Sequence, residues 1–224
     1  MRKDNKLVVR LISYFGGFLI MTLGIAISVK SNLGVSPVSS IPYTMTCVWG
    51  VEMGKATIIF HTALVVMQIL LLRKNFKIKN LLQIPVGVVF GYFTTFCNYL
   101  MNFIATPESI VIRILMMLIS TFFIAFGIFM YVPADIMPLA GEGAMLAIAE
   151  VTKKPFANIK LIFDVSMVVI SLLTCLFIIH SFGSVGIGTI IAAVLVGTEL
   201  KCITKLLGSL RNKILTSHYL QENR

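Results

Sequence analysis

The chain has 224 residues, of which 58% are hydrophobic and only 12% are charged. A soluble domain averages about 45–50% apolar and about 25% charged residues, so this composition excludes an ordinary soluble domain and is typical of a multi-span membrane protein. The formal net charge of +10 would also suit a nucleic-acid-binding protein, so the positions of the basic residues have to decide between the two classes.

Six apolar runs are long enough to cross a bilayer. They cover residues 7–29, 57–72, 81–104, 110–132, 159–179 and 185–207, and the second becomes long enough if it begins near Met53. The first run resembles a signal peptide, but it exceeds the usual apolar core of roughly 7–15 residues and no small-x-small cleavage site follows it. We therefore expect a retained first span.

Two shorter apolar segments interrupt this series. Ile41–Trp49 lies between the first and second runs, and Gly143–Val151 follows the fourth run. About two helical turns cannot cross a bilayer, so each segment predicts a short broken helix that is re-entrant or interfacial.

The basic residues are concentrated on one side of the predicted membrane. Only Lys30, Lys55 and Arg113 of the 19 fall in the opposite set of connections. By the positive-inside rule both termini are cytoplasmic, and residues 211–224 form a cytoplasmic basic tail. This asymmetry argues against a nucleic-acid partner, and we expect the basic link from Arg73 to Lys79 to contact anionic lipid.

The two halves of the chain share one pattern. A shift of 103 residues places Arg10 on Arg113 and Gly24-Ile25 on Gly127-Ile128. Because each copy holds three spans, the second copy enters the membrane from the opposite side. We therefore predict an all-α membrane protein of six transmembrane helices, built as two inverted three-helix repeats over residues 1–104 and 105–210, each with a short broken helix.

Polar residues follow one face of the second and fifth spans. Thr57, His61 and Gln68 lie within about 40° of one another on a helix, and Lys160, Asp164 and Ser171 repeat their spacing under the same shift. Such a face turns toward protein or water and away from lipid, so it is a candidate binding surface. The alternatives are a packed core histidine and a Lys160–Asp164 ion pair that only anchors its helix.

The broken segments supply further candidates. Ser36, Ser39 and Ser40 precede a helix N-terminus expected after Pro42, and Glu142 lies in the first turn of the second short helix. Helix capping and dipole compensation are the structural alternatives. The candidate substrate-binding residues are thus Ser36, Ser39, Ser40, His61, Gln68, Glu142, Lys160 and Asp164.

No catalytic or metal-binding motif accompanies these residues. The sequence has no triad pattern, zinc-binding pair or phosphate-binding loop, and its four cysteines lack metal-ligand spacing. We expect neither an enzyme nor a cofactor, and we interpret the 12 methionines as packing residues.

Several motifs resemble the YczE/YyaS/YitT group of bacterial multi-pass membrane proteins. Lys30–Tyr43 resembles the signature of that group, and Pro138–Gly143, Lys160–Ser166 and Gly188-Thr189 with Gly197 are similar to its second half. The resemblance covers about residues 10–207. It implies a protein of the bacterial cytoplasmic membrane with no generally established substrate.

The chain departs from that group at two places. The group often carries a carboxylate near the position of Thr95 and charged residues where this chain has Gly186-Ile187. If those charges bind a ligand in relatives, this protein binds a different ligand or binds less of it.

Two functions fit these features. The first is a transporter or permease for a small solute or ion, with a midplane site at the repeat interface. The alternative is a non-transporting accessory or scaffold protein that stabilises or regulates a membrane partner, in which case both polar faces are dry and packed. The expected partners are the lipid bilayer and a small solute; the solute, the coupling ion and any homo-oligomer stay open.

Overall fold

The computed structural model describes residues 3–216, and within that range the chain is helical without any strand. This confirms the all-α prediction. The helices are α1 (Lys3–Ser31), α2 (Pro37–Trp49), α3 (Met53–Leu72), α4 (Gln83–Met101), α5 (Ile110–Tyr131), α6 (Ala140–Thr152), α7 (Phe156–Ile179) and α8 (Ile187–Thr216). Helix α8 extends into the tail expected from residue 211, and the remainder of that tail lies outside the described residues.

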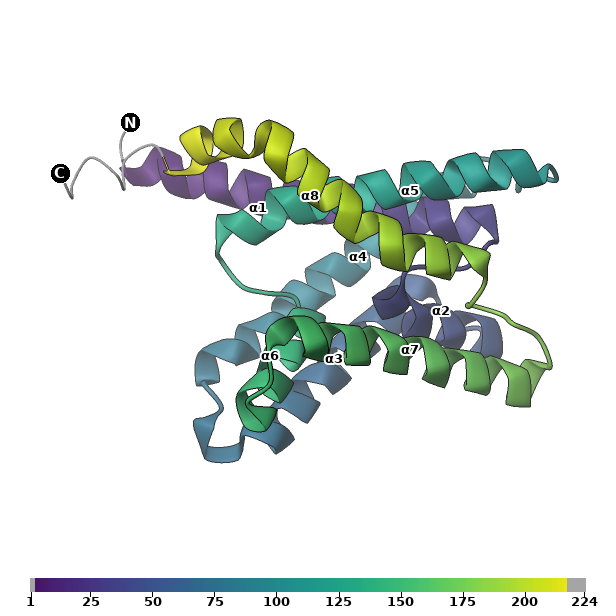
Figure 1. The fold of residues 1–224 in the computed structure, drawn as a ribbon, viewed down its shortest axis with the longest axis horizontal. Helices are drawn as coiled ribbons and strands as arrows, with labels where there is room; N and C mark the ends of the chain where they lie inside the picture. Colours follow the sequence, from purple (N-terminus) through teal and green to yellow (C-terminus); the bar gives the residue numbers. More distant parts are fainter. Residues whose placement is uncertain (1–2, 217–224) are drawn as a thin grey trace.

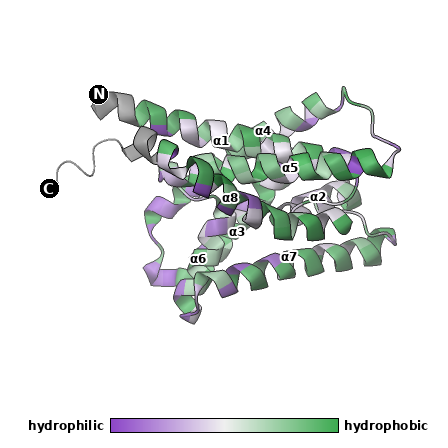
Figure 2. Cartoon of the chain, turned by 45° about the horizontal axis from the view of Figure 1, so that its top comes forward, coloured by the Kyte–Doolittle hydropathy of each residue, from purple (hydrophilic) through white to green (hydrophobic). Residues whose placement is uncertain are grey.

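Among the described residues, five helices have the length and apolar composition to cross a membrane: α1, α3, α4, α5 and α7. Helix α8, the sixth expected span, is not among them. Hydrophobic residues cover much of the long helices in Figure 2, including α5 and α7. Their exposed side chains include Leu161, Val165 and Phe177, so the protein presents an apolar surface to the bilayer.

The short helices begin earlier than their apolar cores predict. Helix α2 starts at Pro37, so the helix N-terminus expected after Pro42 is wrong and Pro42 lies inside the helix. A proline in the first turn needs no hydrogen-bond donor and has a preset φ, which allows Pro37 to start the helix. Helix α6 likewise begins at Ala140, three residues before Gly143.

Helices α1 and α5 run antiparallel and pack closely along each other, on the side of the molecule that also carries α8 in Figure 1. Glycine permits this close approach. A Cβ atom on Gly127 would lie 2.6 Å from the carbonyl oxygen of Gly17, and one on Gly17 would lie 2.8 Å from the carbonyl oxygen of Gly127. The Arg10 guanidinium joins α1 to the 3₁₀ turn Val132–Ala134 after α5 by donating to the carbonyl oxygen of Ala134 at 2.8 Å.

The other helices are distributed around this pair in a similar way for both halves. Helix α4 packs on α1 while α8 packs on α5, and α6 packs on α3 while α2 packs on α7. The short helices start at residues 37 and 140, and the helices after them start at residues 53 and 156; both intervals are 103 residues. The short helices therefore each cross to a long helix of the other half.

One contact breaks this correspondence. Helices α3 and α4 pack tightly, because Gly54 and Gly91 face each other: a Cβ on Gly91 would lie 2.8 Å from the carbonyl oxygen of Gly54. Helices α7 and α8 have no comparable contact. Under the shift of 103 residues, Gly91 corresponds to Val194 of α8, whose side chain is 62% exposed. Helices α7 and α8 are thus separated, although α7 still packs on α6.

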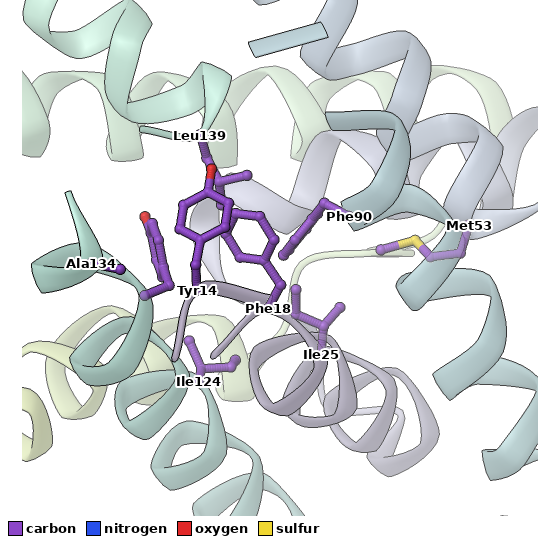
Figure 3. Packing of buried hydrophobic residues seen from close by; sticks show 9 residues of the cluster. Tyr14, Phe18, Ile25, Met53, Phe90, Ile124, Ala134 and Leu139 are labelled. Atoms are coloured by element: carbon purple, nitrogen blue, oxygen red, sulfur yellow. The ribbon is translucent and has the colours of Figure 1, made fainter. Parts of the chain in front are cut away.

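A cluster of buried aromatic and aliphatic side chains joins α1, α4 and α5. Figure 3 shows the rings of Tyr14, Phe18 and Phe90 close together, with Ile25 and Ile124 nearby. The Tyr14 hydroxyl donates to the carbonyl oxygen of Met137 at 2.7 Å, so the ring is anchored at its polar end. This cluster holds α1, α4 and α5 in fixed positions around the cavity described next.

Candidate functional site

The main cavity of the described structure has a volume of about 790 Å³ and is lined by residues from all eight helices. Most of the lining is apolar. The polar and charged side chains in it are Ser36, Ser39, Thr57, His61, Tyr131, Asp135, Glu142, Lys160 and Asp164. Of the eight predicted binding residues, only Ser40 and Gln68 lie outside this lining.

Glu142 enters the cavity from the first turn of α6. Its Oε1 atom accepts a hydrogen bond from the hydroxyl of Tyr131, a side chain that is only 2% exposed. Burial raises the pKa of the Glu142 carboxyl above its ordinary value, whereas the Tyr131 hydrogen bond and the positive charge of Lys160 act in the opposite direction. No sequence pattern marks Tyr131 as a site residue, and it is detectable only through its contact with Glu142.

Lys160 and Asp164 form the ion pair that the sequence predicted as an alternative. The Lys160 Nζ atom lies 2.8 Å from Asp164 Oδ2, and the lysine side chain is 52% exposed while that of Asp164 is 21% exposed. The second carboxylate oxygen, Asp164 Oδ1, is buried and has no hydrogen-bond partner among the described residues. The pair therefore leaves one acceptor of Asp164 unused at the cavity wall.

His61 lies opposite on α3 and is only 4% exposed. Its ring stacks on Phe90 at a centroid distance of 5.5 Å, and a Cβ on Gly87 would lie 3.1 Å from its Nδ1 atom. Nδ1 is buried without a hydrogen-bond partner among the described residues. The neighbouring face of α4 thus supplies packing to His61 and no polar partner.

The serines before and within α2 separate into two environments. Ser36 donates to the Oγ atom of Ser39 at 3.0 Å, and both residues line the cavity. Ser40 faces the other way: its hydroxyl donates to the carbonyl oxygen of Pro37 at 2.6 Å and accepts from Ser171 at 2.8 Å. Ser40 and Ser171 thus join α2 to α7 inside the protein.

Gln68 belongs to a similar internal contact in the first half. Its Nε2 atom donates to Gln83 Oε1 at 2.8 Å and lies 3.3 Å from the carbonyl oxygen of Ala140, while Gln83 Nε2 donates back to Gln68 Oε1 at 3.3 Å. Both glutamines are almost fully buried. This amide pair joins α3 and α4 to the first turn of α6, which carries Glu142. Gln83 is not among the predicted binding residues, although a glutamine in a predicted span is itself a signal.

The two ends of the cavity differ. Two charged lining residues, Asp135 and Lys160, are exposed, and the carbonyl oxygen of Asp135 accepts a hydrogen bond from Arg10 of α1 at 2.8 Å. Near the end of α1, the link after this helix is bonded to the link before α8 and to the first turn of α8: Val35 N donates to the carbonyl oxygen of Ser184 at 3.3 Å, and Gly188 N donates to that of Leu33 at 2.8 Å. There the hydroxyls of Thr44 and Ser184 also lie 2.6 Å apart. Exposed charged residues of the lining thus lie toward the start of α1, and hydrogen bonds between the links lie toward its end.

Metal binding finds no support in the described residues, where no group of three or more His, Cys, Asp and Glu side chains is arranged to hold an ion.

Comparisons with known proteins give one family and one relative. A family model described as a family of unknown function, DUF6198, matches residues 8–205. The uncharacterized membrane protein YczE of Bacillus subtilis strain 168 is 28% identical over 199 residues, which cover 88% of this chain and 86% of the relative. No solved structure matches the chain.

Proposed function

Because the chain belongs to the DUF6198 family of unknown function, we propose its function from the cavity: it is a transporter that moves a small solute across the membrane. The family match and the YczE relative confirm the resemblance to YczE-like proteins that the sequence predicted, and the multiple apolar helices fit an integral membrane protein. Neither comparison names a solute.

The observation that carries the proposal is the composition of the cavity lining. Under the shift of 103 residues, many lining residues of the first half correspond to lining residues of the second. The corresponding pairs include Met21 and Ile124, Ile25 and Ile128, Ser39 and Glu142, Thr57 and Lys160, His61 and Asp164, and Phe90 and Ala193. A cavity at the junction of two related halves is the usual place for a transporter site.

The proposed transporter has six spans in two inverted repeats. Helix α8 is the sixth span, since it lies beside α5 as α4 lies beside α1. The basic links before α4 and α7 lie toward the same end of the molecule as the start of α1 and the end of α8 in Figure 1. By the positive-inside rule this end is cytoplasmic. The cavity would then be open to the cytoplasm, with the Leu33–Gly188 contact closing the outside.

The scaffold alternative has support from a different observation. Gln68 and Gln83, like Ser40 and Ser171, are packed and hydrogen-bonded within the protein, as a scaffold predicts. His61 and Asp164, on the same faces, keep buried polar atoms without partners among the described residues. A buried polar atom that lacks a hydrogen-bond partner beside a cavity favours a ligand site, because buried polar atoms in a structural core are usually hydrogen-bonded within the protein.

Thiol accessibility tests the proposal without knowledge of the solute. In a variant with its four cysteines replaced by serine, Ser39→Cys places a thiol in the cavity, and Ala125→Cys places one in the fully buried α5 core as the control. A transporter exposes the cavity to each side in turn. We expect a membrane-impermeant thiol reagent to label Ser39→Cys from either side, more slowly from outside, and to leave Ala125→Cys unlabelled.

Labelling from one side alone would contradict transport through this cavity and favour the scaffold. The readout does not depend on the charge of any ligand.

A further inference from the structure

The charged side chains of the cavity are unequal in sign. Three carboxylates line it, Asp135, Glu142 and Asp164, against one ammonium group, Lys160. Lys160 bonds Asp164 at one carboxylate oxygen and leaves the other unpartnered. Arg10 faces the loop of Asp135 from outside the lining, and its guanidinium is directed to backbone carbonyl oxygens. The cavity therefore has more acidic than basic side chains and an unused acceptor.

His61 adds a second buried polar group without a partner. Its Nδ1 atom has no hydrogen-bond partner within the described part of the chain and lies beside Gly87 of α4, and the side chain is more than nine-tenths buried. A neutral imidazole can accept a hydrogen bond from a charged N–H group. His61 and Asp164 occupy corresponding positions in the two halves, and both residues line the cavity.

The remainder of the lining is suited to an apolar body. Methionine and isoleucine side chains from α1, α3, α5 and α6 line it, together with the rings of Phe60, Phe90 and Phe156. Aromatic faces attract cations as well as apolar groups. A volume of about 790 Å³ lies within the range of about 300–1,000 Å³ typical of small-molecule sites. A small hydrated metal ion would leave most of this apolar surface unused.

We propose that the solute is an amphipathic organic cation, whose positive head lies among Glu142, Asp164 and His61 and whose apolar body contacts the methionine and phenylalanine side chains. This inference rests on the proposed function, because it names the solute class of the same cavity. Helices α7 and α8 both line the cavity without packing closely on each other, and their exposed apolar side chains include Leu161 and Val194. A route from the bilayer between these two helices suits such a molecule.

The test compares two ions of the same shape and opposite charge. Tetraphenylphosphonium and tetraphenylborate are titrated against the full-length protein in one detergent, and the Kd is taken from the rise of the unfolding temperature with ligand concentration. We expect the cation to stabilise the protein and the anion to have little effect. Glu142→Gln and Asp164→Asn are each expected to weaken cation binding by about tenfold or more, since each removes one attractive charge.

Two further variants separate binding from folding. Glu150→Gln neutralises an exposed carboxylate on the same helix as Glu142, outside the cavity, and should leave the Kd unchanged. Lys160→Met removes the competing cation and should tighten cation binding. Each shift is measured against the unliganded unfolding temperature of the same variant, so a less stable variant still reports its affinity.

Equal binding of both ions, or no binding of the cation, would overturn the assignment of a cationic solute. If the cation test fails but Ser39→Cys is labelled from both sides, the protein is still a transporter, of another class of solute. If Ser39→Cys is labelled from one side only, the transporter proposal itself is wrong. The two failures are therefore distinguishable.

Discussion

The amide pair of Gln68 and Gln83 offers a prediction whose size follows from the structure. Gln68→Leu keeps the side-chain volume roughly constant but removes both bonds of the pair and the contact with Ala140. The Gln83 amide, 1% exposed, is left buried without its partner. An unsatisfied buried polar group costs about 1–3 kcal/mol. We expect the free energy of unfolding to fall by about 3 kcal/mol for Gln68→Leu and by about 2 kcal/mol for Gln83→Leu.

The double variant separates hydrogen bonding from general damage. With both amides replaced, no unsatisfied amide remains, so the loss should be about 3 kcal/mol or less, below the sum of the single losses. For a chain of this size, each kcal/mol corresponds to about 2–4 °C in unfolding temperature. The native thiols of Cys97 and Cys175 serve as the probe of unfolding, because they are buried in the folded protein and become accessible when it unfolds.

The assay follows the reaction of a fluorogenic maleimide with these two thiols on heating. Cys202, which is exposed, and Cys47, which is partly exposed, are first replaced by serine. The role assigned to the amide pair would be refuted if the single variants unfolded at the same temperature as the parent protein. It would also be refuted if the double variant lost as much free energy of unfolding as the two single variants together. Reduced cation binding by Gln68→Leu is a further expectation, because the pair holds the helix turn that carries Glu142.

Three other substitutions give separate tests. Gly127→Ala places a Cβ 2.6 Å from the carbonyl oxygen of Gly17 and should lower the free energy of unfolding by about 1–3 kcal/mol. Gly197→Ala is the control: the added Cβ has no atom within 4 Å apart from the nearby backbone of its own helix, so the melting temperature should be unchanged or slightly higher. Glu52→Ala removes the side chain that accepts from two backbone N–H groups of the first turn of α3; a loss of about 1 kcal/mol is expected in the same melt, and none would count against the cap. Thr44→Val breaks the Thr44–Ser184 hydrogen bond at the closed end and should speed labelling of the cavity thiol from outside, whereas an unchanged rate would show that this contact does not close the cavity.

The sequence by itself determined the positions of the helices. Long apolar runs bounded by polar links have few other stable forms in a bilayer, because unpaired backbone groups are costly there. The same pattern located the two short helices, although Pro37 extended the first beyond its apolar core. It also placed His61 and Asp164 on faces directed away from lipid, since that inference needs only helical periodicity.

Only the tertiary structure decided which polar residues face the cavity. Periodicity fixes the face on which a side chain lies, but the neighbouring helix determines whether it finds a partner. Gln68 meets Gln83, and Ser171 meets Ser40, so these residues are used in packing. His61 meets Gly87 and Phe90, which offer no polar side chain. The cavity itself depends on a contact made between α3 and α4 and absent between α7 and α8, and such a difference between halves arises from packing across the whole chain.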